Sequence, residues 1–273
     1  MTQNNVEIPT TTNYIQQGEG TPVIMIHGVA ASLHDWDGLI PELSQNGYMC
    51  YALDLLGHGE SPKPESRAYQ MDWIFDHFVN WVTSLRLTEP AILIGHSLGG
   101  HIALEYARRF SAWTRGLVLV NPFYSRSQLP PLLRRSYSNR NLRGRIAGRT
   151  PQWMFRAFVD AASRAMEPGA GALHSLPEHI REQTALDYKR TAAGVYNIPS
   201  VLTDQTEHLS SITFPTLVIW GSQDQTLSPA SFPKLIDAMP RSVGKSFRAG
   251  HVPHQSNEKE FNAEVMEFLK GLG

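Results

Sequence analysis

The sequence predicts an α/β fold in which a mostly parallel, doubly wound sheet carries an inserted helical cap. Two observations support this prediction. Short apolar runs rich in β-branched residues alternate with stretches of helical apolar spacing, and one long segment interrupts the alternation. A strand that helices cover on both faces is apolar along its whole length. Repeated strand and helix units with right-handed crossovers build such a layered sheet.

Five apolar runs are expected to be buried strands. They lie at residues 23–28, 48–54, 91–96, 116–121 and 216–221. Helical spacing of large apolar residues predicts helices over 72–85 and 100–110. A last strand is expected near 246–248, followed by a final helix over 258–269.

The segment from residue 123 to 208 is far longer than the usual loop of about 2–6 residues between a strand and a helix. Thr150 and Pro151 are typical of a helix start, an apolar stripe follows, and Pro168 with Gly169 ends it. A second helix is expected near Pro177. We therefore predict a layered α/β core over 1–122 and 209–273, and over 123–208 a cap of three or four helices inserted after the sixth strand.

Composition excludes several classes of protein. A formal net charge of -1 over 273 residues gives no general attraction to nucleic acid, and no nucleic-acid partner is expected. The single cysteine, Cys50, permits no intramolecular disulfide, and we expect it to be a small buried apolar residue in a cytoplasmic protein. The first residues do not resemble a signal peptide, and no run reaches the ~18 apolar residues of a membrane span. No integral membrane association is expected.

The strongest chemical signal is Gly95-His96-Ser97-Leu98-Gly99-Gly100, which stands between an apolar strand and a helix. This is the context that the GxSxG nucleophile elbow requires. Glycine two positions to either side leaves room for a sharp turn that lifts the serine hydroxyl above the carboxyl ends of the strands. Ser97 is therefore the candidate nucleophile.

A serine nucleophile needs a base to take its proton and an acid to orient that base. Asp224 follows the strand at 216–221, and His251 follows the last strand. Both thus stand at carboxyl ends of strands, in the order serine, acid, histidine. His254, three residues after His251, is a rival base.

The tetrahedral intermediate needs two N–H donors. We expect the backbone N–H of Leu98, directly after the nucleophile, and that of Val29, directly after the pair His27-Gly28, to form the oxyanion hole. His27 itself is interpreted as a structural loop residue. Gly28 and His96 are expected beside the substrate.

The stretches VIMIHGVAASLHDW, DLLGHGESPKP, GHSLGG, ITFPTLVIWGSQD and GHVPHQSNEKEF cover much of the chain outside the cap. In them the sequence resembles the capped α/β-hydrolases, which include carboxylesterases, lactonases, meta-cleavage-product hydrolases and perhydrolase-like enzymes. The resemblance implies an α/β-hydrolase fold, a catalytic triad of Ser97, Asp224 and His251, a helical lid and no cofactor. It also favours His251 over His254 as the base.

Two departures narrow the expected reaction. Ser97 stands where related dehalogenases and epoxide hydrolases have aspartate, and His96 stands where carbon–carbon hydrolases commonly have asparagine. We therefore predict a carboxylic ester hydrolase acting on a small-molecule ester, lactone or thioester through an acyl-enzyme. A carbon–carbon hydrolase or perhydrolase-like enzyme with the same triad, and a slow-turnover ligand receptor of the same fold, are the alternatives.

Three further signals concern the cap and possible metals. Seven arginines and no acidic residue or lysine lie between residues 126 and 149, which we interpret as a solvated cap face rather than a site for anionic substrates. Trp153 and Phe158 are candidates for the substrate pocket. The eleven histidines form no HExxH or paired cysteine–histidine spacing, so no metal is expected.

Overall fold

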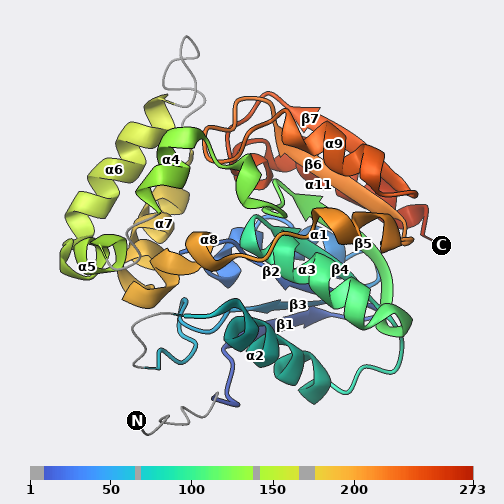
Figure 1. Cartoon of the computed structure of the whole chain (residues 1–273). Coiled ribbons are helices and arrows are strands. Elements are labelled where there is room, and N and C mark those ends of the chain that lie inside the picture. Colours follow the sequence, from blue (N-terminus) through green and yellow to red (C-terminus); the bar gives the residue numbers. More distant parts are fainter. Residues whose placement is uncertain (1–8, 65–68, 138–141, 166–175, 273) are drawn as a thin grey trace, which may run out of the picture.

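A computed structural model describes residues 9–64, 69–137, 142–165 and 176–272. Among these residues, seven strands form one sheet in the order β1-β3-β2-β4-β5-β6-β7 (Figure 1). The strands are β1 (Tyr14–Gly18), β2 (Thr21–Ile26), β3 (Tyr48–Leu53), β4 (Ala91–His96), β5 (Thr114–Val120), β6 (Thr216–Gly221) and β7 (Ser242–Phe247). Only β1 pairs antiparallel, against β3, and every other pairing is parallel. The predicted mostly parallel sheet is confirmed.

The inner strands are apolar on both faces because each face packs on its own layer of helices. On one side lie α2 (Met71–Ser84), α3 (Leu98–Arg109) and α9 (Ser231–Ala238), which contribute Phe78, Ile102 and Phe232 to the core. On the other side lie α1 (Ile40–Ser44) and α11 (Glu258–Lys270), which contribute Leu43 and Phe261. Alternate residues of β2 point into the two cores. The sheet is therefore covered on both faces.

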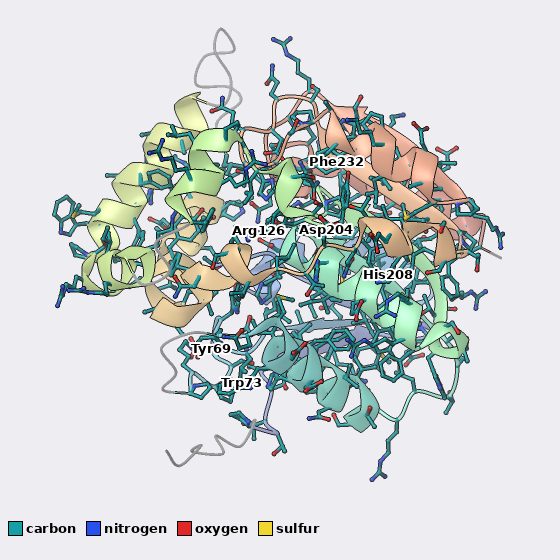
Figure 2. The ribbon with its side chains drawn as sticks, viewed as in Figure 1. Tyr69, Trp73, Arg126, Asp204, His208 and Phe232 are labelled. Atoms are coloured by element: carbon teal, nitrogen blue, oxygen red, sulfur yellow. The ribbon has the colours of Figure 1, made fainter. Side chains whose placement is uncertain are left out.

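The segment predicted as a cap contains α4 (Pro131–Ser136), α5 (Leu142–Arg149), α6 (Gln152–Ala165), α7 (Glu178–Arg190) and the short α8 (Ile198–Val201). Figure 1 shows α4 to α7 grouped on one side of the sheet. The chain leaves and rejoins the core at one point, since the Gln205 N–H donates to the Tyr124 carbonyl at 3.0 Å and Ser125 donates to Asp204 at 2.6 Å. Figure 2 marks this junction by Arg126 and Asp204. The predicted stop at Pro168 and Gly169 lies outside the described residues.

One detail of the predicted topology needs correction. The helical segment follows β5, the fifth strand of the described chain, and not a sixth. Only one strand, β1, precedes the first parallel strand within the described residues. No strand was predicted at β1 because its residues, YIQQG, are mostly polar and lie at an exposed sheet edge. Every helix within the described residues is too short or too polar to span a membrane.

Candidate active site

Ser97 occupies a strained turn between β4 and α3. Its φ of 51° and ψ of -109° lie in a region that residues with side chains rarely adopt. A Cβ at Gly95 would come 2.4 Å from the Gly99 carbonyl oxygen, and one at Gly99 would come 2.0 Å from the Ile26 carbonyl oxygen. Glycine is therefore required at both positions. The turn is held by the Ser97 N–H, which donates to the Val120 carbonyl at 2.9 Å.

The structure brings His251 to Ser97 although 154 positions separate them. The two atoms His251 Nε2 and Ser97 Oγ are 3.1 Å apart, and His251 Nδ1 lies 2.7 Å from Asp224 Oδ2. With a proton on Nδ1 facing the carboxylate, Nε2 is free to accept the proton of the serine hydroxyl. Serine, histidine and aspartate thus form one continuous hydrogen-bonded chain.

Asp224 is buried and surrounded by donors. Its Oδ1 accepts from the N–H groups of Thr226 at 2.7 Å and Leu227 at 3.1 Å, and Asn121 Nδ2 donates to Oδ2 at 2.6 Å. Burial alone would raise the pKa of Asp224, but His251 and these hydrogen bonds leave the pKa lowered. The carboxylate is therefore ionised and fixed. Sequence reasoning missed Asn121, whose only signal is its position at the carboxyl end of β5.

The two predicted oxyanion donors follow the carboxyl ends of the paired strands β2 and β4. Leu98 is the first residue of α3, where backbone N–H groups and the helix dipole favour negative charge, and Val29 borders the same cavity as Ser97. Gly28 allows the loops to approach, since a Cβ there would come 2.9 Å from His96 Nδ1. His27 ties the loop to the segment that follows β3, because its Nε2 accepts from the Leu55 N–H at 3.0 Å.

A cavity of about 650 Å³ lies above Ser97 and reaches from the strand ends to the cap. This volume is typical of sites for small molecules. Its walls include Val29, Ser97 and His251 from the core and Phe155, Phe158 and Tyr188 from the cap.

One pocket prediction is wrong. Trp153 is 70% exposed and does not line the cavity, whereas Met154 and Phe158 do. Met154 and Phe158 are four residues apart and share one face of α6, while Trp153 points to another face. Phe158 is itself 61% exposed and lies at the rim.

His254, the rival base, faces a different carboxylate. Its Nε2 lies 4.0 Å from Oδ2 of Asp35, and His96 Nδ1 lies 3.1 Å from the same oxygen. His96 Nε2 donates to the His251 carbonyl at 3.0 Å. Burial lowers the pKa of His96 to about 4 despite Asp35 beside it. Thus His96 borders the cavity, as expected, with its two nitrogens directed at Asp35 and at the His251 carbonyl, and sequence reasoning missed Asp35.

Two other sequence interpretations concern Cys50 and the arginine stretch. Burial raises the pKa of the Cys50 thiol to about 12, which fits a buried apolar role and not a nucleophile. In the stretch, Arg134, Arg135, Arg145 and Arg149 are exposed. Arg143 instead lies over the Tyr137 ring, 3.9 Å from its centroid, beside the cavity. Arg140 lies outside the described residues.

The chain is similar to known proteins in both sequence and structure. A family model described as alpha/beta hydrolase fold matches residues 21–257. A pimeloyl-[acyl-carrier protein] methyl ester esterase of Aeromonas hydrophila is 26% identical over 93% of this chain and 97% of its own length. A 2-hydroxy-6-oxo-6-(2'-aminophenyl)hexa-2,4-dienoic acid hydrolase of Metapseudomonas resinovorans is 23% identical over 94% and 87%. The solved structure of a thermophilic esterase from Thermogutta terrifontis superposes with a TM-score of 0.78, at 21% identity over 96% and 93% of the two chains.

Proposed function

Because the chain is a hydrolase of the α/β-hydrolase fold family, we propose that it cleaves a carboxylic ester through an acyl-enzyme on Ser97. One observation carries the proposal. The hydrogen-bonded chain from Ser97 Oγ through His251 to Asp224 opens onto a cavity large enough for a small ester. The similarity to the Aeromonas methyl ester esterase supports an ester over other acyl compounds.

The proposed reaction has two halves. Ser97 Oγ attacks the ester carbonyl carbon while its proton passes to His251 Nε2, and the carbonyl oxygen becomes an oxyanion held by the N–H groups of Val29 and Leu98. The carbon–oxygen bond to the alcohol then breaks, and His251 returns the proton to the departing alkoxide. Water then gives a proton to His251 Nε2 and attacks the acyl carbon. The bond between that carbon and Ser97 Oγ breaks, His251 returns the proton to Oγ, and the acid leaves. Asp224 stabilises the imidazolium in both halves.

The test is a Ser97→Ala variant assayed on a short activated ester. Loss of the nucleophile should lower kcat by about 10⁴–10⁶ without unfolding, since the hydroxyl lies at the cavity and fills no core volume. An organophosphonate should label one serine of the wild type, on the peptide that contains Ser97. As a matched control, Ser210→Ala, at an exposed position, should keep full activity and labelling.

Substantial esterase activity in Ser97→Ala, or labelling of another residue, would remove the basis for this mechanism. Folded wild-type protein that binds esters but does not turn them over would instead favour the ligand receptor of the same fold.

A further inference from the structure

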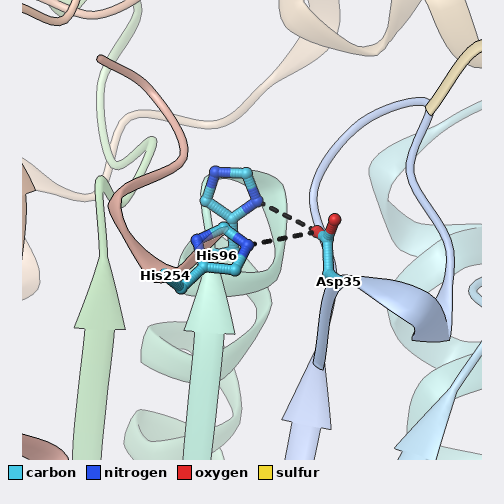
Figure 3. A group of neighbouring side chains, drawn as sticks. All are labelled: Asp35, His96 and His254. Carbon is cyan, nitrogen blue, oxygen red and sulfur yellow. Dashed lines mark hydrogen bonds and ion pairs between the residues drawn. The ribbon is translucent and has the colours of Figure 1, made fainter. Parts of the chain in front are cut away.

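Beside the nucleophile, three side chains from distant parts of the chain converge. Asp35 lies on η1 (Leu33–Trp36), His96 ends β4, and His254 lies on α10 (Pro253–Ser256). One donor atom from each side chain lies within 4.8 Å of the other two. In Figure 3 both rings point at one oxygen of Asp35. The three side chains are at most 8% exposed.

The hydrogen bonds of His96 leave a lone pair pointing at a carboxylate. A carbonyl oxygen only accepts, so His96 Nε2 must carry the proton that it donates to the His251 carbonyl. In a neutral imidazole that is the only ring proton. Nδ1 then presents a lone pair to Asp35 Oδ2 at 3.1 Å. Two acceptors this close repel unless a cation lies between them.

His254 supplies an independent observation. Its side chain is 1% exposed, and among the described residues neither ring nitrogen has a hydrogen-bond partner. Buried polar atoms are normally paired, because leaving one unpaired destabilises the folded state. Its Nε2 lies 4.0 Å from Asp35 Oδ2, too far for a hydrogen bond, with the ring directed at the same point as that of His96.

From this convergence we propose that Asp35, His96 and His254 form a binding site for one divalent transition-metal ion of the zinc type. Zinc takes imidazole nitrogen and carboxylate oxygen at about 2.0–2.1 Å, which places neighbouring tetrahedral ligands roughly 3.3 Å apart. The distances of 3.1 and 4.0 Å from Asp35 Oδ2 bracket that value. The three residues border the cavity, so water supplies the fourth ligand and the ion enters by the same route.

The surroundings match those of known metal ligands. A metal-bound histidine usually donates its other N–H to a carbonyl or carboxylate, and a bound carboxylate is itself hydrogen-bonded. Here His96 donates to the His251 carbonyl, and Gln255 Nε2 donates to Asp35 Oδ1 at 3.1 Å. The ion would join η1, the end of β4 and α10, and would steady the backbone that carries His251. This proposal departs from the expectation of no metal, which considered only ligand spacing along the chain.

The first test measures uptake. Full-length protein without a histidine tag is stripped with a chelator, incubated with zinc chloride and desalted, and its zinc is measured by mass spectrometry. We expect about one zinc ion per chain and a higher melting temperature than that of the stripped protein. No uptake above a buffer blank, with an unchanged melting temperature, would overturn the proposal.

Variants then locate the ion. Asp35→Asn keeps the shape of the side chain, and His254→Phe keeps an aromatic ring beside Trp36 and Phe261. Each should weaken zinc binding at least about tenfold. The matched control is His208→Ala, which removes an exposed histidine over the core, away from the cap helices (Figure 2). Zinc retained by both cluster variants, or lost from the control, would contradict this site.

A proton is the competing cation, and nitrogen NMR of the histidines separates the two. We expect the zinc-loaded protein to show His96 protonated on Nε2 alone. If His96 is doubly protonated and stays so in excess zinc, a histidine–aspartate ion pair replaces the metal site. The site is independent of the proposed function, so Ser97→Ala should bind zinc as the wild type does.

Discussion

Two groups of aspartate and histidine lie near Ser97 and are built from the same residue types. In one, Asp224 holds Nδ1 of His251, and Nε2 faces the Ser97 hydroxyl, which is a proton donor. In the other, Asp35 faces both His96 and His254, while the second nitrogen of His96 faces a carbonyl. The difference lies in the atom that the far nitrogen meets. A histidine that meets a hydroxyl can take its proton, whereas histidines directed at a shared carboxylate are arranged to hold a cation.

The largest expected effect is the loss of kcat when His251 is replaced, compared with the loss when His254 is replaced. His251→Ala removes the only histidine within hydrogen-bond distance of Ser97 in the described structure, so kcat should fall by about 10⁴–10⁶. His254→Ala should cause a far smaller loss, because this ring faces Asp35 and not the nucleophile. Steady-state kinetics on one activated ester measures both. A His254→Ala variant without turnover, beside an active His251→Ala variant, would reverse the assignment of the base.

Replacing Asp224 should likewise lower kcat much more than replacing Asp35. Asp224→Asn leaves His251 without a carboxylate to fix its tautomer and stabilise the imidazolium, which should lower kcat on the order of 10⁴. Asp35→Asn should act mainly on the melting temperature, because Asp35 does not contact the base that meets Ser97. Kinetics and thermal melting on both variants make the comparison. Equal losses of kcat would show that the two groups act as one unit.

Another carboxyl that lines the cavity, Asp187, sharpens the comparison because serine and glutamine, and not histidine, donate to it in the described structure. Asp187 of α7 accepts from Ser32 at 2.9 Å and Gln183 at 2.8 Å. Burial, with the charge of Asp35 nearby, raises its pKa to about 7 from an ordinary value near 3.8. Between these two pH values the unfolded chain releases the proton while the folded chain keeps it. The free energy of unfolding should therefore fall as pH rises from about 4 to about 7.

The variant Asp187→Asn should remove this dependence. Above pH 7 it should be more stable than the wild type by an amount on the order of a few kcal/mol, and the advantage should shrink toward pH 4. Urea unfolding at pH 5 and pH 8 measures it. Asp237→Asn, at an exposed position on α9, is the control and should leave the wild-type slope intact. An identical slope in Asp187→Asn would exclude Asp187 as its source.

The smallest expected effects test the cap side of the cavity. Phe158→Ala should raise KM roughly fivefold with little change in kcat, since a rim side chain contributes about 1 kcal/mol of apolar contact. Trp153→Ala should change neither constant, because Trp153 lies outside the cavity. A larger effect at Trp153 than at Phe158 would mean that substrate approaches over the opposite face of α6.

Local sequence determined much of this protein. The five apolar runs became β2 to β6, because strands covered on both faces are apolar along most of their length. The turn around Ser97 was recognisable because its two glycines and its neighbouring strand and helix lie within a few residues. Asp224 and His251 could be proposed because loops after parallel strands meet at one edge of the sheet.

Tertiary structure alone decided which other side chains meet there. Asn121 reaches Asp224 from the turn after β5, and Asp35, His96 and His254 come together from three distant parts of the chain. No spacing along the chain encodes such contacts, because they depend on the strand order and on the packing of α10 near η1. The orientation of α6 likewise placed Phe158, and not Trp153, at the cavity. Sequence patterns report which face of an element is apolar, whereas the rotation of that element against its neighbours is settled only when the whole core packs.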